Sequence, residues 1–271
     1  ARHTFRCRTL DPFLTIAAML VQVMHGNVAI AHVVRLMHAA FTASAYCQAR
    51  ARLPLEVLRV LLGEMVRGAR SFLAGPAAPG LWRGRRTLLI DGSGFSMPDT
   101  PALAAHFGLG PGQAPGCGFP VGHLVALFDA ATGLLLDLTT AAGRVGELTM
   151  AACTRTWLRR GDVLVGDRLY CSFAHFAVLQ TLGVDGLFRL HQSRPGRRAV
   201  RRTRRRRRAN GNLAEESVLV RRLSRDDRIV EWMRPWRCAA WHTPAEHAAL
   251  PRFLRVRLVR FRTFRRGWRS R

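Results

Sequence analysis

The chain has 271 residues, 48% of them hydrophobic, which suffices for one large buried core or two ordinary ones and excludes global disorder. Its 43 basic residues are all arginine and stand against 17 acidic residues, so the formal net charge is +26 and the pI is about 11.8. A surplus of this size has to be solvated or paired with an anionic partner, and nucleic acid is the usual one.

Residues 12–70 are predicted to be helical, because apolar residues recur there at spacings of three and four. Breaks are expected at residues 25–27 and 52–54, where Pro54 suits a helix start. The apolar stretch "FLTIAAMLVQVM" is too short to cross a bilayer, so we expect no membrane contact. The chain shows no secretory leader pattern and begins with Ala1 rather than Met, which predicts a piece of a longer reading frame.

A Pro/Gly-rich linker is expected at residues 73–84, and strands and helices alternate after it. The expected order is a strand, a Gly-rich loop, a hairpin, a helix, a strand, a helix and a strand, in the segments "RTLLID", 108–122, "HLVALFDAATGLLLDLTTA", "GELTMAACTRTWLRRG", "DVLVGD", "SFAHFAVLQTLG" and "DGLFRLH". This order predicts an α/β domain with a mixed sheet. The Gly-rich loop lacks the Gly-Lys-Ser/Thr ending of a phosphate-binding loop, so we expect no nucleotide cofactor.

Residues 192–271 are more basic than the rest, with 25 of the 43 arginines and six acidic residues. An arginine run at 201–208 is followed by segments whose apolar residues alternate as in strands, namely "ESVLVRRL", "RIVEWMR" and "FLRVRLVRFR". The run is either a phosphate-binding loop or a solvated loop enriched by codon bias. The six cysteines form no Cys-x-x-Cys pair, which argues against a zinc ribbon and suits a reducing cytosol.

Two carboxylates stand out by their position. Asp91 follows the apolar run 88–90, and Asp167 follows the run 163–165 and Gly166. Binding sites in α/β sheets gather at the carboxyl ends of strands, and two converging carboxylates repel each other unless a cation lies between them. Oxygen ligands of this kind suit Mg²⁺ or Mn²⁺, which can activate water for hydrolysis of a phosphodiester. The alternative is that each aspartate caps a turn.

Glu147 is expected to complement a helix dipole rather than to act in catalysis.

Several separated motifs, in order, resemble the bacterial insertion-sequence transposases of the IS4 type. They are "FTASAYCQARARLP", "LLIDGSGFSMPDTPALAAHFG", "PGCGFPVGHLVALFDAATGLLLD", "GDVLVGDRLYCSFAHFAVLQTLGVDGLFRLHQ", "RDDRIVEWMRP", "TPAEHAALP" and "RVRLVRFRTFRRGWRSR". The resemblance implies an RNase H-like fold and an Asp-Asp-Glu (DDE) triad that uses Mg²⁺ to cut and join transposon ends. It also implies that Asp91 and Asp167 are the first two acids and metal ligands. Arg168 and Tyr170 belong to the segment around the second acid.

The third acid of that family is a glutamate in a Tyr-x₂-Arg-x₃-Glu-x₆-Lys pattern. Here the tyrosines are Tyr46 and Tyr170, both too early in the chain, and lysine is absent, so the pattern does not occur. Glu231 in an expected strand and Glu246 in an expected turn lack the surroundings of that glutamate. We therefore expect a partial, inactive copy of a transposase, cut off before its third catalytic acid.

The sequence thus predicts a helical region at 1–72, a linker at 73–84, an RNase H-like core at 85–192 and an Arg-rich, β-rich insertion at 193–271. The predicted function is metal-dependent DNA transposition, with double-stranded transposon ends and target DNA as partners. A homodimer and a cytoplasmic, nucleoid-associated location in a bacterium are expected. The alternatives are a non-catalytic DNA-binding remnant and a metal-dependent nuclease of the same fold. The residues expected to contact DNA are Arg168, Arg201, Arg202, Arg204, Arg205 and Arg206.

Overall fold

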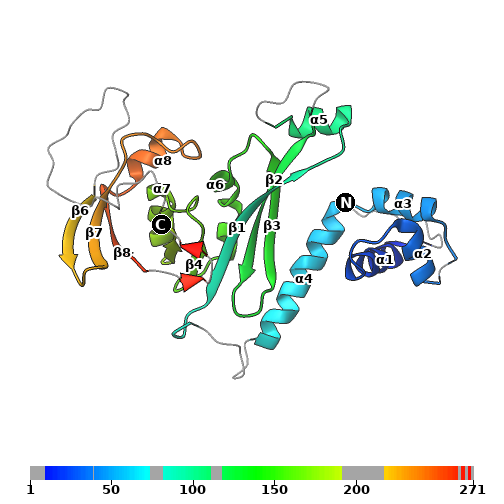
Figure 1. Ribbon diagram of the computed structural model, residues 1–271, viewed down its shortest axis with the longest axis horizontal. Coiled ribbons are helices and arrows are strands. Elements are labelled where there is room, and N and C mark those ends of the chain that lie inside the picture. The colour runs from blue at the N-terminus through cyan, green and yellow to red at the C-terminus, as the bar shows by residue number, and fades with distance from the viewer. Residues whose placement is uncertain are drawn as a thin grey trace. The chain divides into compact units, whose positions relative to one another are not determined.

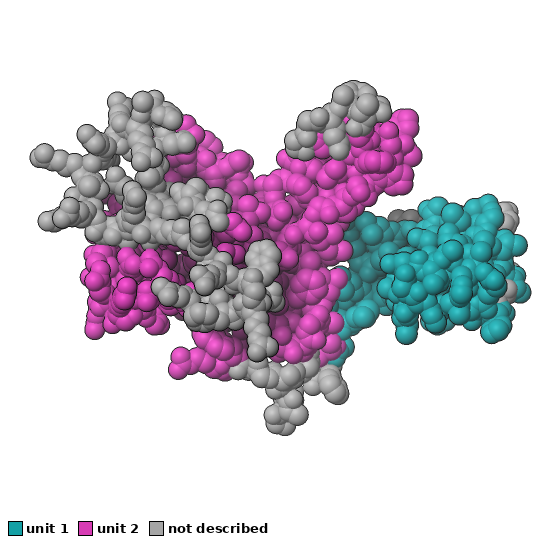
Figure 2. Space-filling view, in the orientation of Figure 1, with its two compact units in different colours: residues 1–68 teal, residues 69–271 magenta. Residues whose placement is uncertain are grey.

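The computed structural model describes residues 10–38, 40–73, 82–110, 118–190 and 217–261, and two short strands at 264–265 and 268–269. The chain divides into two compact units, residues 1–68 and residues 69–271, which Figure 2 shows in different colours. Each unit is described by itself below. Within the described ranges, no helix is long and apolar enough to span a membrane.

The first unit is helical, as its sequence predicts. Its helices are α1 (Pro12–Met24), α2 (Ile30–Leu36), α3 (Ala43–Arg52) and the beginning of α4 (Leu55–Leu73). The Asp11 side chain accepts a hydrogen bond from the Leu14 amide at 2.7 Å and so caps α1. The helices α1 to α3 and the Phe41 loop enclose a small core that includes Ala18, Val33 and Tyr46. The apolar stretch at 29–41 holds one more break than expected, because α2 ends at Leu36.

The second unit is built on a five-stranded mixed sheet (Figure 1). Its strands are β1 (Thr87–Ser96), β2 (Val121–Asp129), β3 (Leu135–Ala142), β4 (Val163–Gly166) and β5 (Asp185–Phe188). The order in the sheet is β3-β2-β1-β4-β5. Strands β3, β2 and β1 are antiparallel neighbours, whereas β1, β4 and β5 run parallel. The predicted mixed α/β class and the predicted hairpin of β2 and β3 are confirmed.

Strand β1 is longer than its apolar run suggests. The sequence predicts that the strand ends at Asp91, but β1 continues to Ser96 because its pairing with β2 extends over that whole length. Its pairing with β4 ends at Ile90, opposite Gly166. Asp91 therefore lies inside the antiparallel half of the sheet and at the end of the parallel half.

The connections between strands carry α5 (Pro101–Phe107), α6 (Glu147–Met150), the 3₁₀ helix η1 (Cys153–Trp157) and α7 (Phe173–Thr181). Helix α5 was not predicted, although Thr100 caps it and Pro101 opens it. A single amphipathic helix over residues 146–161 was expected, and that prediction is wrong. The hydroxyl of Thr154 donates to the carbonyl of Ala151 at 2.9 Å, a local bond that competes with helix geometry where α6 gives way to η1.

A second, three-stranded sheet packs beside α7. It consists of β6 (Ser217–Arg222), β7 (Asp227–Met233) and β8 (Phe253–Val259), all antiparallel, as the alternating segments predict. Trp232 and Leu254 share one hydrophobic cluster with Phe173 and Ala177 of α7. The turn expected around Glu246 is instead a short helix, α8 (Pro244–Ala249), with a capping box. A pair of short strands, β9 (Phe264–Arg265) and β10 (Trp268–Arg269), completes the described fold.

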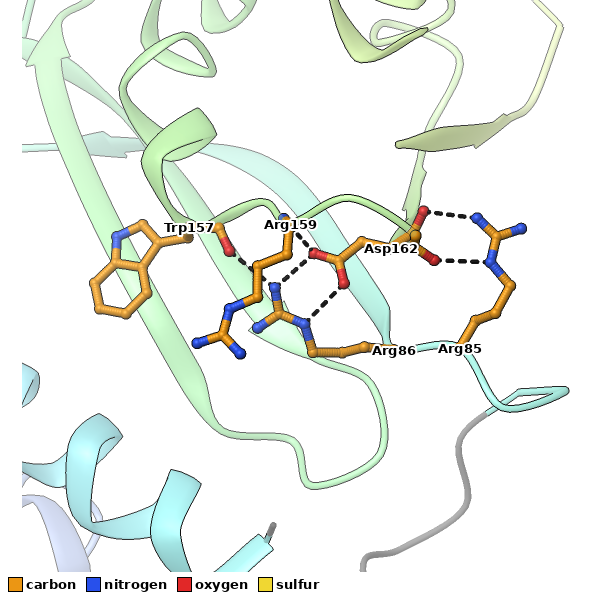
Figure 3. Close-up of polar contacts among 6 residues, drawn as sticks. Arg85, Arg86, Trp157, Arg159 and Asp162 are labelled. Atoms are coloured by element: carbon orange, nitrogen blue, oxygen red, sulfur yellow. Dashed lines mark hydrogen bonds and ion pairs between the residues drawn. The ribbon is translucent and has the colours of Figure 1, made fainter. Parts of the chain in front are cut away.

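Two arginines fix the edge of the sheet where its parallel strands begin (Figure 3). The Arg86 guanidinium donates to both carboxylate oxygens of Asp162, with Nε–Oδ1 at 3.0 Å and Nη2–Oδ2 at 2.5 Å. Arg85 donates to the carbonyls of Gly161 and Asp162 and to the carboxylate of Asp185. These bonds join the residues just before β1 and β4 to the first residue of β5. They so favour the register in which Thr87 pairs with Val163 and Val163 with Asp185. We name Arg85, Arg86, Asp162 and Asp185 together the arginine clamp.

Candidate active site

The register of β1 and β4 brings the two predicted aspartates together. The last parallel pair is Ile90 with Gly166, and the next residue on each strand is Asp91 or Asp167. Neighbouring strands lie about 4.8 Å apart, so the two backbones are close at this point. Both aspartates are exposed. The backbones of the two aspartates therefore lie at the same end of the β1–β4 pair, whereas a shared site of their carboxylates stays a prediction.

Each aspartate makes one short local hydrogen bond. The Gly92 amide donates to Asp91 Oδ1 at 3.0 Å, and the Leu169 amide donates to Asp167 Oδ1 at 2.7 Å. Asp167 thus does cap its own turn, as the simpler interpretation of the sequence proposed. The capping uses Oδ1 alone, and an ionised carboxylate has further acceptor sites on both oxygens.

A third carboxylate lies beside this pair. Glu147, the first residue of α6, is half-buried, and its Oε2 accepts a hydrogen bond from the Tyr170 hydroxyl at 3.3 Å. Its carboxylate also lies against Gly92, so closely that a Cβ atom on Gly92 would overlap it. Glu147 therefore reaches the residue next to Asp91 as well as the segment that follows Asp167.

All three acids affect the pKa of the Tyr170 hydroxyl. Its side chain is fully buried, and burial is the main reason why the pKa of Tyr170 is raised, followed by the charge of Glu147 and its hydrogen bond. The charges of Asp91 and Asp167 raise the same pKa further. Tyr170 consequently stays protonated and serves as a hydrogen-bond donor among the carboxylates.

These three acids have no arginine partner among the described residues, unlike many other acids of the described part. Among the described residues, no basic side chain forms an ion pair with Asp91, Asp167 or Glu147. Elsewhere in the described part, seven acidic residues are paired with arginine, namely Glu56, Glu64, Asp162, Asp185, Asp226, Asp227 and Glu231. In a chain of net charge +26, a group of acids without arginine suits a cation that comes from solution.

The donor set fits a hard divalent cation. No group of three or more His, Cys, Asp or Glu side chains in the described ranges could hold a metal ion by itself. Mg²⁺ needs no such cage, because it usually takes one or two protein carboxylates and completes its shell with water and substrate phosphates. Asp91 and Asp167 meet this requirement, since both are exposed and adjacent across two strands.

The other predicted site residues lie in different surroundings. Arg168 follows Asp167 and is half-buried. Glu231 pairs with Arg255 at 3.1 Å, and Glu246 closes the capping box of α8, so both have structural roles. The five arginines predicted to bind DNA between positions 201 and 206 lie outside the described residues.

Glu147 is the residue whose surroundings the sequence did not predict. It does begin a helix, as expected, but α6 has only four residues. The nearest sequence signal is Tyr170, three positions after Asp167, because a tyrosine hydroxyl usually finds a partner when it is buried, as this one is. The contact of Glu147 with Gly92 joins segments that are distant along the chain.

Comparison with known proteins identifies the family of the chain. Residues 82–251, more than half of the chain, match the model of the family described as "Transposase DDE domain". Over 132 residues the chain is 29% identical to the "Putative transposase InsZ" of Escherichia coli (strain K12). That match covers 48% of this chain and 42% of InsZ, so the chain spans less than half the length of this relative.

Two solved transposase structures are also similar. A piggyBac transposase in a synaptic complex with hairpin DNA aligns over 82% of this chain and 48% of its own, with 13% identity and a TM-score of 0.39. The Mos1 transposase in a paired-end complex with the left transposon end aligns over 69% of this chain and 61% of its own, with 10% identity and a TM-score of 0.25. With its family match spanning both aspartates, the chain belongs to the transposase DDE domain family.

Proposed function

We propose that the protein is an insertion-sequence transposase in which Asp91 and Asp167 hold Mg²⁺ or Mn²⁺ for phosphoryl transfer on DNA. The observation that carries this proposal is the parallel register that ends at Ile90 and Gly166, one residue before each aspartate. Both carboxylates are exposed at the same edge of the sheet, without an arginine partner among the described residues. A structural pair of aspartates would be costly there, because like charges repel.

The strand order β3-β2-β1-β4-β5, with an antiparallel half and a parallel half, supports the assignment of the core as RNase H-like. The IS4-type assignment rests on the motifs around the two aspartates. The four-part division of the chain, at 72, 84 and 192, remains our proposal for the boundaries of the helical region, linker, core and insertion. The homodimer and the cytoplasmic, nucleoid-associated location are likewise proposed from the function.

In this mechanism the bound cation would polarise the scissile phosphate and lower the pKa of an attacking water. Asp91 and Asp167 would supply the carboxylate oxygens that hold it, and their local hydrogen bonds from Gly92 and Leu169 orient them. Arg168, next to the second aspartate, would pair with a DNA phosphate. The arginine-rich tail adds salt-sensitive attraction to the duplex.

The family's Tyr-Arg-Glu-Lys pattern does not occur in these 271 residues. This observation favours a second candidate, a non-catalytic DNA-binding protein that keeps the charge and the fold. It also leaves a third, a metal-dependent nuclease that completes its site with a local residue. The three candidates differ in whether the chain cuts DNA and in which side chains the cutting needs.

A strand-cleavage assay on the purified chain tests the proposal, with Mg²⁺ or Mn²⁺ and with DNA carrying the terminal repeats of the element. Asp91→Ala and Asp167→Ala are compared with Asp129→Ala, because Asp129 caps a turn between β2 and β3 in the way that a purely structural aspartate does. DNA binding is measured in parallel at two salt concentrations.

Because the family's third acid does not occur in these 271 residues, cleavage by this chain would need a local residue that completes the site. Such cleavage should depend on the metal, be abolished in both site variants and be kept in Asp129→Ala. Binding that weakens with salt, without any cleavage, would favour the non-catalytic protein. Cleavage that survives in Asp167→Ala would overturn the assignment of the site.

A further inference from the structure

Building on the proposed metal site, we infer that Glu147 and Tyr170 are positioning residues that hold Asp91 and Asp167 at the spacing needed to share a cation. The inference depends on the proposed function. It concerns a residue pair that the resemblance does not assign a role and whose contacts the sequence did not predict.

The contacts form a continuous connection between the two aspartates. From Asp167, the chain runs over three residues to Tyr170, whose hydroxyl donates to Glu147 Oε2. The Glu147 carboxylate lies on Gly92, and the Gly92 amide donates to Asp91 Oδ1. A shift of the Glu147 carboxylate would therefore disturb Gly92 directly, and with it the amide that orients Asp91.

The Tyr170 ring is itself fixed against the last parallel pair of strands. A Cβ atom on Gly166 would lie 3.0 Å from the Tyr170 ring and 3.0 Å from Ile90, so the ring lies directly over this pair. The side chain is fully buried, which leaves it little freedom to move. Tyr170 thus ties Glu147 to the place where β1 and β4 separate.

Positioning explains the geometry better than direct ligation does. Among the residues that the structure describes, no three acidic, His or Cys side chains lie close enough to hold one ion, so Glu147 does not join the two aspartates around a common centre. Along β1 the side-chain directions alternate, and the Gly92 position faces the opposite side of the strand from Asp91. Glu147 consequently approaches from the face opposite the Asp91 side chain.

Partners that orient a metal ligand, without touching the metal, typically contribute about 10- to 100-fold to metal affinity. The readout is therefore Mn²⁺ affinity, measured on the full chain without DNA by the electron paramagnetic resonance signal of free Mn²⁺. Thermal unfolding followed by circular dichroism confirms that each variant is folded.

Three variants break the connection at different atoms. Tyr170→Phe removes the donor, Glu147→Ala removes the acceptor, and Gly92→Ala adds a methyl group that displaces the Glu147 carboxylate. We expect each to weaken Mn²⁺ binding about 10-fold or more. The matched control is Gly94→Ala, on the same face of β1, where a Cβ atom would meet its nearest neighbour at an ordinary 3.8 Å. It should bind like the wild type.

Two further variants separate positioning from ligation and from a general packing defect. Glu147→Gln keeps an acceptor for Tyr170, so its affinity should fall by no more than about threefold. Adding Glu147→Ala to Gly92→Ala should cause no further loss, because the added methyl group then has no carboxylate to displace.

The outcomes distinguish the inference from the function on which it rests. If Asp91→Asn and Asp167→Asn bind Mn²⁺ as tightly as the wild type, the metal site itself is wrong. If those two lose binding while Tyr170→Phe and Gly92→Ala do not, the site stands and the positioning role is overturned. If Glu147→Gln loses as much as Glu147→Ala, the Glu147 charge matters rather than its hydrogen bond, and the positioning role is again overturned.

Discussion

The two ends of the β1–β4 pair treat their acidic residues in opposite ways. Where the strands begin, Asp162 is nearly buried and bonded to Arg86 through both oxygens. Where they separate, Asp91 and Asp167 are exposed, and the described residues provide no arginine partner for them. The same two strands therefore carry a neutralised end and an end with unbalanced negative charge.

This difference supports the proposal that Asp162 serves the fold and that Asp91 and Asp167 serve a ligand. With 43 arginines in the chain, a partner for any surface carboxylate is easy to supply. Acids that remain together without one favour unfolding through their mutual repulsion, a cost that functional sites commonly carry. The arginine clamp helps to set the register of β1 and β4, and that register brings Asp91 and Asp167 together.

Removing the Asp162 carboxylate from the arginine clamp should have the largest effect on stability. Asp162→Ala leaves the Arg86 guanidinium, 19% exposed, without its carboxylate partner, although its bond to the Trp157 carbonyl remains. Breaking a buried ion pair from one side costs about 3–5 kcal/mol. Urea unfolding measures the change. The control is Asp185→Ala at the same edge, whose carboxylate is 69% exposed, where we expect a loss below about 1 kcal/mol. Equal losses in the two variants would contradict the structural role of the Arg86–Asp162 pair.

Acid should destabilise the fold through His175, which lies against the Tyr170 ring. Burial, and then the nearby Arg155, lower the pKa of His175 to about 3. An unfolded histidine has a pKa near 6.5, so between these values the unfolded state binds the extra proton. The neutral form of His175 therefore costs no stability above about pH 6.5. On acidification from there toward pH 3, the free energy of unfolding falls by about 1.4 kcal/mol per pH unit.

Urea unfolding between pH 7 and pH 4 measures this dependence. His175→Leu keeps an apolar side chain in the aromatic surroundings and should flatten the acidic limb of the curve. A curve with the same slope in wild type and variant would show that other groups cause the acid sensitivity.

Filling the space at Gly166 should have an intermediate effect. An added Cβ would lie 3.0 Å from both Ile90 and Tyr170 and 3.2 Å from Phe188. Overpacking of this kind typically costs about 1–3 kcal/mol, so Gly166→Ala should lower the free energy of unfolding by that amount. Gly146→Ala is the matched control, since its added Cβ would meet nothing within 4 Å. Calorimetric melting compares the two, and an equal shift would argue against tight packing beneath the aspartates.

Neutralising Asp91 and Asp167, where β1 and β4 separate, should change stability least, and should raise it rather than lower it. Asp91→Asn and Asp167→Asn keep the local hydrogen-bond acceptors and remove a repelling charge. Without metal, we expect a gain of up to about 1 kcal/mol in the free energy of unfolding, comparable to an exposed ion pair. The gain should shrink as salt screens the charges. A clear loss of stability would mean that these aspartates serve the fold, as Asp162 does.

Much of the sheet could be predicted from local sequence. The apolar runs at 88–90 and 163–165, the hairpin around residues 131–133 and the alternation of β6 to β8 all correspond to strands. The extension of β1 beyond Asp91 could not, because pairing with β2 overrides the weak strand preference of Gly92 and Gly94.

The site was predictable in part. Two acids that follow apolar runs predict a shared sheet edge once the strands are parallel neighbours. The contact between Glu147 and Gly92 could not be predicted from the sequence. It joins distant segments, and Gly92 contributes to it only by lacking a side chain. The clamp was hidden for another reason, since Arg85 and Arg86 are two among 43 arginines and only the fold distinguishes them.

The most direct test of the site is an anomalous diffraction map from crystals of the full chain soaked in Mn²⁺. The shared-cation account predicts a peak with one carboxylate oxygen each from Asp91 and Asp167 at about 2.1 Å, a typical distance for small hard cations. The peak should disappear in crystals of Asp167→Asn. A peak bound to one aspartate alone, or none at this edge while Mn²⁺ occupies other sites, would contradict the claim that the two strands share a cation.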